Sequence, residues 1–169
     1  MDTMTKTHIH ANAVNPIEIF VRNATRGRHP VPLVETGYDV TFDAGFAVIE
    51  ARRVFRNDEP KSIEAVLTFP MPVAAAVFDL EARIGGRTLR AKAKRRAAAR
   101  ESYEAGIDAG KASMLHEELM PGIHMLSVGQ VGPGATIEIV TRFAMVAADT
   151  GGKSTLRIPL TVGQVYGCS

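Results

Sequence analysis

The stretch that decides the fold is IEAVLTFPMPVAAAVFDLEARIGGRTLR, residues 63–90. It opens with an apolar run rich in β-branched and aromatic residues, which ends at Pro70-Met71-Pro72. Residues 76–84 then alternate: one face takes Phe78, Leu80, Ala82 and Ile84, and the other takes Asp79, Glu81 and Arg83. A period of two is typical of a half-buried strand, and Gly85-Gly86 is suited to a hairpin turn. The stretch therefore predicts three consecutive strands.

The rest of the chain predicts further short strands, separated by turns rich in Gly, Pro, Asn and Asp. Most of them alternate apolar and polar residues, which is typical of strands in an antiparallel sheet. A short edge strand is expected around Ile17–Val21. The longer predicted strands are YDVTF (38–42), FAVIEARRVF (46–55), ASMLHEEL (112–119), IHMLSVGQV (123–131), TIEIVTRFAMV (136–146) and TLRIPLTV (155–162).

Residues 92–109 depart from this pattern, because Ala, Arg, Lys and Glu dominate there and all four favour helices. Ala99, Tyr103 and Ile107 are spaced four apart and would form one apolar stripe, and Gly110 is suited to a helix C-terminus. One helix is too few for a parallel βαβ fold. The sequence therefore predicts a mainly β protein, an antiparallel β-sandwich of about eight to ten strands with one α-helix at about 92–109.

Length and composition favour one soluble domain. With 169 residues, 46% of them apolar, the chain can bury a substantial core. We expect residues 1–32 to be a flexible or extended segment, with the first 14 disordered, and residues 33–169 to form the domain. No apolar segment is long enough for a signal peptide or a bilayer span, so a cytoplasmic location is expected from this chain. Cys168 is the single cysteine, which excludes an internal disulfide and a cysteine-based zinc site.

Two stretches, residues 55–89 and 99–143, carry a set of short motifs in a fixed order. They are an Asn before a strand, an FP-x-P element, a helix with Ala and Tyr four apart that ends in Gly, and a Pro-Gly turn before a strand. In this order and spacing the chain resembles the vault protein inter-α-trypsin (VIT) domain over about residues 33–167. The matching positions include Asn57, Phe69, Pro70, Pro72, Ala99, Tyr103, Gly110, Pro133 and Gly134.

The resemblance implies a role in protein interaction or scaffolding, since VIT domains are not known as catalysts. Such domains usually stand at the N-terminus of a longer chain, before a von Willebrand A-type domain. The expected partner is therefore that downstream domain or another protein. The metal-binding D-x-S-x-S motif of the A-type domain does not occur in these 169 residues, so no metal role transfers, and no cofactor is expected.

A basic run is the strongest local charge feature, although the net charge of the chain is only +2. We favour the interpretation that this run is the solvent-facing side of the predicted helix and of the segment that leads into it. Docking of a protein and binding of a polyanion such as nucleic acid stay open as alternatives, but no aromatic residues accompany the run for stacking on bases. The run comprises Arg87, Arg90, Lys92, Lys94, Arg95, Arg96 and Arg100.

No catalytic site is predicted, because the chain has no G-x-S-x-G and no recognisable nucleophile with a base. His116 and His124 lie on neighbouring predicted strands and could approach each other as metal ligands. We favour the simpler interpretation that they are exposed strand residues. Asp79 and Glu81 share a strand face, which is typical of a face in solvent.

Overall fold

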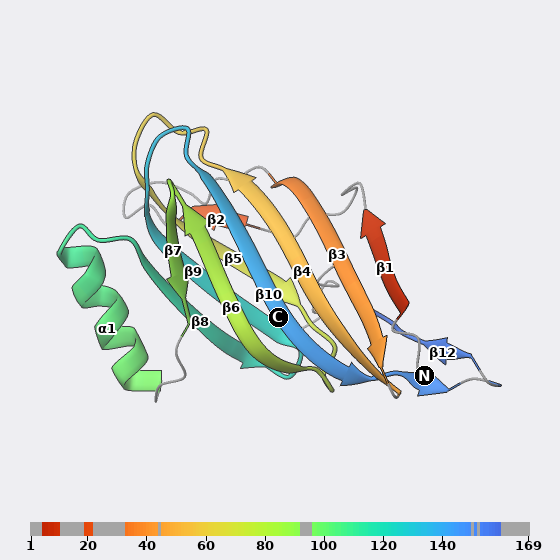
Figure 1. The fold of residues 1–169 in the computed structure, drawn as a ribbon. Helices are drawn as coiled ribbons and strands as arrows, with labels where there is room; N and C mark the ends of the chain where they lie inside the picture. Colours follow the sequence, from red (N-terminus) through yellow and green to blue (C-terminus); the bar gives the residue numbers. More distant parts are fainter. Residues whose placement is uncertain are drawn as a thin grey trace, which may run out of the picture.

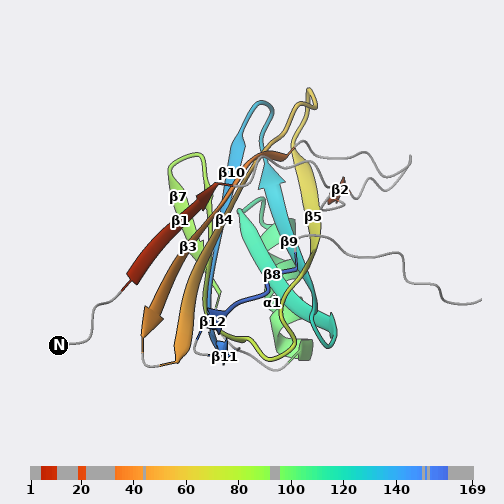
Figure 2. The same cartoon turned by 90° about the vertical axis from the view of Figure 1, so that its right-hand side faces the viewer.

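A computed structural model describes residues 5–10, 19–21, 33–43, 45–91, 96–149, 151 and 153–159. Within these residues, two antiparallel sheets pack face to face, and one helix lies beside them (Figure 1, Figure 2). The fold is therefore mainly β, as the sequence predicts. The strand periods explain this, because alternating side chains give each sheet one apolar face to bury against the other.

The first sheet has six strands in the order β1-β3-β4-β10-β6-β7, and the second has four in the order β2-β5-β9-β8. We call them the six-stranded and the four-stranded sheet. The strands of the six-stranded sheet are β1 (Thr5–His10), β3 (Leu33–Asp43), β4 (Phe46–Arg56), β10 (Thr136–Val146), β6 (Ala76–Ile84) and β7 (Arg87–Arg90). Those of the four-stranded sheet are β2 (Ile19–Val21), β5 (Ile63–Pro70), β9 (Ile123–Val131) and β8 (Ser113–Met120). A separate two-stranded ribbon joins β11 (Ala148–Asp149) and β12 (Ser154–Thr155).

The core lies between the inner faces of the two sheets. On β4 every second residue is buried, and on β5 the odd-numbered residues are buried, as expected for strands with one face inward. The largest fully buried side chains include Phe69, Ile49, Leu80, Leu126 and Ile139. These residues come from five different strands, so the core ties both sheets together.

The helix α1 (Arg96–Asp108) packs along β8, the edge strand of the four-stranded sheet. Two glycines allow this close approach. A Cβ on Gly106 would lie 2.0 Å from the Ser113 Oγ, and a Cβ on Gly129 would lie 1.9 Å from the Ile107 Cδ1. The helix ends at Gly110 because its φ of 65° is the left-handed conformation of a Schellman cap, in which Gly110 N donates to Ile107 O and Lys111 N donates to Gly106 O.

Several sequence expectations differ from the structure at the chain ends. The described helix runs from Arg96 to Asp108, and the predicted start near residue 92 falls on residues 92–95, which lie outside the described part of the chain. Residues 5–10, which we expected to be disordered, form β1 and pair with β3. The last predicted strand is wrong over residues 156–159, which have no strand geometry. Its remaining residues, 160–162, are not described.

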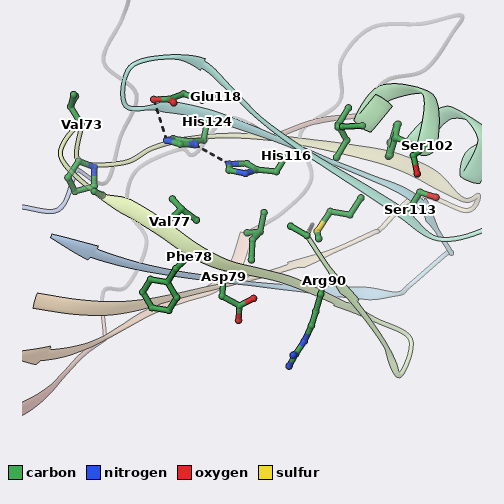
Figure 3. Close-up of a pocket in the computed structure, with 18 residues that line it drawn as sticks. Val73, Val77, Phe78, Asp79, Arg90, Ser102, Ser113, His116, Glu118 and His124 are labelled. Carbon is green, nitrogen blue, oxygen red and sulfur yellow. Dashed lines mark hydrogen bonds and ion pairs between the residues drawn. The ribbon is translucent and has the colours of Figure 1, made fainter. Parts of the chain in front are cut away.

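Phe78 is the clearest error inside the sheet. Simple alternation placed it on the inner face, but it is 59% exposed. The pairing of β6 with β10 shifts register between Arg142 and Phe143, because Asp79 pairs with Arg142 while Val77 pairs with Phe143. Such a bulge turns two successive residues to one face. Phe78 and Asp79 accordingly point to the same side of β6 in Figure 3.

Candidate functional site

The residues that carry the family resemblance hold turns and the core, and Asn57 is the most connected of them. Its side chain is fully buried, and its Oδ1 accepts from the Glu59 backbone N–H at 2.9 Å. Its backbone N–H donates to Ala135 O, and its carbonyl accepts from Gly134 N. Its Nδ2 lies 2.9 Å from the carbonyl oxygens of Lys61, Val131 and Gly132. Asn57 thus joins the turn after β4 to the turn that contains Pro133 and Gly134.

Phe69, Pro70 and Pro72 shape the end of β5. Phe69 is fully buried between the sheets, and Pro70 is the last residue of the strand, paired with Ile123 of β9. The carbonyl of Pro72 accepts from the Ala75 N–H at 2.9 Å and closes the turn that leads into β6. These residues therefore act on the architecture of the domain.

Ala99 and Tyr103 lie on the side of α1 that faces the sheet. Tyr103 is 8% exposed, and its hydroxyl donates to Glu64 Oε1 at 2.7 Å. Glu64 lies between the core residues Ile63 and Ala65 on β5, so it occupies the face of that strand away from the core. The predicted helix stripe is confirmed, and it anchors α1 to this face.

The basic run is only partly a solvated surface. Arg100 donates from Nε and Nη2 to the two carboxylate oxygens of Glu117, at 3.0 and 3.2 Å, and Glu117 is buried. Arg90 pairs with the buried Glu81 at 2.8 Å. Arg87 is exposed on β7. Lys92, Lys94, Arg95 and the side chain of Arg96 lie outside the described residues. At Arg90 and Arg100, then, positive charge is already balanced by carboxylates.

A network of ion pairs covers the outer face of the six-stranded sheet. Glu81 is its centre and is 2% exposed, although the sequence pattern predicts a solvent face. The arginine side chains above it provide that cover. Its carboxylate contacts Arg83, Arg90 and Arg142 at 3.0, 2.8 and 3.2 Å. Burial acts to raise the pKa of Glu81, but hydrogen bonds from Arg83 and Arg142 and the charge of Arg90 outweigh it and lower the pKa.

The same network extends to the neighbouring strands. Arg142 donates to Glu50 at 2.7 Å and also pairs with Asp79. Glu138 pairs with Arg52 at 2.7 Å and with Arg83 at 3.3 Å. Because acidic and basic groups alternate across this surface and satisfy one another, the central part of the face offers no net charge to a ligand.

A groove of about 660 Å³ opens along the flank of the sandwich, between β6 and β8. Figure 3 shows Val77 on one wall and the rings of His116 and His124 on the other. The His116 Nε2 and the His124 Nδ1 are 3.0 Å apart, within hydrogen-bond distance, and the two rings stack at 5.1 Å. The His124 Nε2 lies 4.0 Å from Glu118 Oε1.

The expectation that these histidines are exposed is therefore wrong. His124 is 8% exposed, and both rings stack with Phe69 of the core. His116 pairs with the buried Leu126, and His124 pairs with Glu118, so the two histidines are diagonal neighbours on adjoining strands. Burial lowers the pKa of His116 to about 4, with a further lowering by His124. Burial also lowers the pKa of His124. The pair is uncharged at neutral pH.

The histidine pair does not extend to a metal centre. Within the described ranges, no group of three or more His, Cys, Asp or Glu side chains is placed to hold a metal ion. Likewise, none of the helical residues described here forms a segment long and apolar enough to cross a membrane.

An exposed apolar surface lies at one end of the six-stranded sheet. It comprises Phe46, Val48, Phe78 and Val146, which are 53, 42, 59 and 65% exposed, and we call it the apolar end patch. Phe46 pairs directly with Val146, and Val48 pairs with Ala144, which in turn pairs with Ala76. Figure 1 shows the start of β4, the end of β10 and the start of β6 meeting at this end. Grouped exposed apolar side chains of this kind mark interaction sites more often than isolated ones do.

The family model of the vault protein inter-alpha-trypsin domain matches residues 33–143, which include every strand from β3 to the bulk of β10 and the helix. The chain belongs to the VIT domain family. This confirms the resemblance that the sequence motifs carry.

Two relatives of the chain are much longer proteins, and each matches it over a short part of its length. The chain is 24% identical over 145 residues to von Willebrand factor A domain-containing protein 5A of Rattus norvegicus, with 84% of this chain and 18% of the relative covered. It is 30% identical over 114 residues to protein mono-ADP-ribosyltransferase PARP4 of Mus musculus, with 66% of this chain and 6% of the relative covered. The chain thus spans less than a fifth of each relative.

Proposed function

We propose that this VIT domain is a non-catalytic module of a longer protein and that its apolar end patch binds a von Willebrand A-type domain. The observation that carries the proposal is the patch itself. Four large apolar side chains stand more than 40% exposed on adjoining strands, while ion pairs occupy the central part of the same face. Apolar area that is removed from water by a partner is the main favourable term in protein association.

The choice of partner rests on the family and on one relative. The chain belongs to the VIT family, and the rat relative is named for a von Willebrand A domain. The ion pairs beside the apolar end patch balance one another. A folded domain that covers the patch would therefore bury no unpaired charge of this network. Polyanion binding through the basic run has less support, since Arg90 and Arg100 are engaged with Glu81 and Glu117.

A first experiment measures the mass of the endogenous protein with an antibody against this domain. We expect a species far above the 18.2 kDa of the chain. If such a protein is found, Phe46→Ser and Val146→Ser in it should release the domain contact, which limited proteolysis between the two domains would detect. Val34→Ser is the matched control, because Val34 is 60% exposed on β3 outside the patch. An endogenous species of 18 kDa would refute the longer protein.

A further inference from the structure

The strand β8, at the edge of the four-stranded sheet, is held to the core from its inner side by a titratable group. The His116 ring of β8 stacks on Phe69 of β5, and its Nε2 lies 3.0 Å from the His124 Nδ1 of β9. Within β8, Glu117 is the one buried residue, and the others are half-buried or exposed. Because successive residues of a strand point to opposite faces, Glu117 binds Arg100 of α1 on the outer side while His116 contacts the core.

The hydrogen bond between the two imidazole rings needs one donor and one acceptor. In the neutral pair, one of the two facing nitrogens carries a hydrogen and the other accepts it. One added proton is compatible with this arrangement. When it resides on His124, Nδ1–H donates to the His116 Nε2, and Nε2–H faces Glu118 Oε1, 4.0 Å away (Figure 3). The closed fold therefore has a place for a first proton.

A second proton has no such place. With both rings protonated, both nitrogens of the 3.0 Å contact would carry a hydrogen, and neither would accept. Two positive charges would also lie beside the buried Phe69 ring, whose centre is already 5.0 Å from the Arg53 guanidinium. Like charges so close together and away from water oppose each other's ionisation. Accordingly, burial and the charge of His124 lower the pKa of His116 to about 4.

The charged groups around the pair give little further compensation for a second positive charge. Among the described residues, these groups and the nearby phenol are Glu117 and Glu118 of β8, Asp79 of β6, Arg90 of β7, Tyr103 of α1 and, across Phe69, Arg53 of β4. Glu117 is bound by Arg100, and Asp79 and Arg90 are paired within the six-stranded sheet. Glu118 is the carboxylate that contacts the pair, and one carboxylate balances one positive charge.

We propose that the His116–His124 pair is an acid-sensitive switch for the edge strand β8, which stays closed with one proton on the pair and opens with the second. Opening separates β8 from β9 and from Phe69 and brings both charged rings into water. It uncovers the edge and inner face of β9, while the six-stranded sheet stays folded. This switch is independent of the docking proposed for the apolar end patch, which lies on the other sheet.

The test follows amide hydrogen exchange in the full 169-residue chain by NMR, from pH 7 to about 4.5. One proton taken up on opening raises the opening constant by up to about tenfold for each pH unit. The amides that pair β8 with β9 should therefore lose protection about tenfold or more relative to those that pair β4 with β10. His116→Phe keeps a ring on Phe69 but takes up no proton, so β8 should stay protected. His8→Phe, on β1 of the other sheet, is the matched control and should behave as wild type.

Two further measurements decide the proposal even where His116→Phe fails to fold. Nitrogen-15 shifts of the wild-type rings should show a first proton on the pair at a higher pH and a second proton only near pH 4. Glu117→Gln, which removes the ion pair with Arg100, should weaken β8 at every pH but keep the acid-dependent step. Loss of protection in all strands together, an equal loss in His116→Phe, or independent titration of both rings near their ordinary pKa would overturn the proposal.

Discussion

Arg100 of the helix and Glu117 of β8 form a two-point ion pair, with Nε to Oε1 at 3.0 Å and Nη2 to Oε2 at 3.2 Å. Glu117 is buried, whereas Arg100 is about half exposed. The pair therefore fixes the N-terminal half of α1 onto the edge of the four-stranded sheet. It also removes Arg100 from the set of cations available to a polyanion.

Arg100→Ala should lower the free energy of unfolding by about 1–2 kcal/mol, because it leaves a buried carboxylate without its arginine, and solvent at the arginine moderates the loss. Chemical denaturation measures this. Arg87→Ala is the matched control, since Arg87 is exposed on β7, and it should change stability little. Equal effects of the two substitutions would contradict a structural role for Arg100.

Asn57→Ala should be among the most damaging single substitutions, with a loss of about 3 kcal/mol or more, because several buried backbone groups of two turns lose their partner together. Asn57→Asp keeps the acceptor for Glu59 but loses the donors to the three carbonyl oxygens, so it should also destabilise strongly. Thermal melting compares both with Asp58→Ala, which alters an exposed neighbour. A melting temperature of Asn57→Ala near that of wild type would show that the turns hold without it.

Arg53→Met is expected to stabilise the domain. Arg53 is 3% exposed on β4, and its Nε and Nη1 have no hydrogen-bond partner among the described residues. Its Nη2 donates to the Tyr38 hydroxyl at 3.4 Å, and its guanidinium lies 5.0 Å from the centre of the Phe69 ring. Replacing a buried, poorly paired charge by an apolar side chain of similar volume often gains about 1–4 kcal/mol. A lower melting temperature in Arg53→Met would mean that the guanidinium has a stabilising partner.

Stability should fall as the pH drops from about 6.5 toward 4. In the unfolded chain His116 takes up a proton near its ordinary pKa of 6.5, whereas in the fold burial holds its pKa at about 4. The unfolded state therefore binds more protons in this window, and the difference corresponds to about 3 kcal/mol lost by pH 4. A positive charge on His124 lowers the pKa of His116 further, whereas the negative charges of Glu118 and Glu117 raise it.

Denaturation midpoints across this pH range test the effect. His116→Phe removes the titrating group and keeps a ring to stack on Phe69, so its stability should depend less on pH between 6.5 and 4. The lowered pKa of Glu81 adds a further loss below its ordinary value of 4.5, which His116→Phe should not change. If stability falls equally with pH in the wild type and in His116→Phe, His116 is not the cause of the pH dependence.

The sequence predicted correctly the parts of the fold that depend on residues close together in the chain. The bounds of β5 and β6 follow from the apolar run, the prolines and Gly85-Gly86, and the helix stripe follows from the spacing of Ala99, Tyr103 and Ile107. Phe78 was misplaced because the bulge that turns it outward depends on pairing with β10, more than 60 residues away along the chain. The short β1 has no clear alternation, and its position follows from pairing with β3.

The surfaces were harder to predict because they join distant strands. The neighbouring predicted strands indicated that His116 and His124 could approach each other, but not that both face inward, and the burial of Glu81 depends on arginines from β6, β7 and β10. The apolar end patch combines residues from β4, β6 and β10. Only the pairing of the strands brings these side chains together, whereas the alternation of each strand alone indicates an ordinary half-buried element.

The most direct test of the proposed docking is oxidative footprinting of Phe46 and Phe78 with hydroxyl radicals, read by mass spectrometry. Both rings are more than half exposed in the domain, so they should be labelled readily in the isolated 169-residue chain. In the endogenous protein we expect much weaker labelling of both rings, while the exposed Val34 is labelled equally in the two samples. Equal labelling of Phe46 and Phe78 in the endogenous protein and in the isolated chain would contradict a partner domain on the apolar end patch.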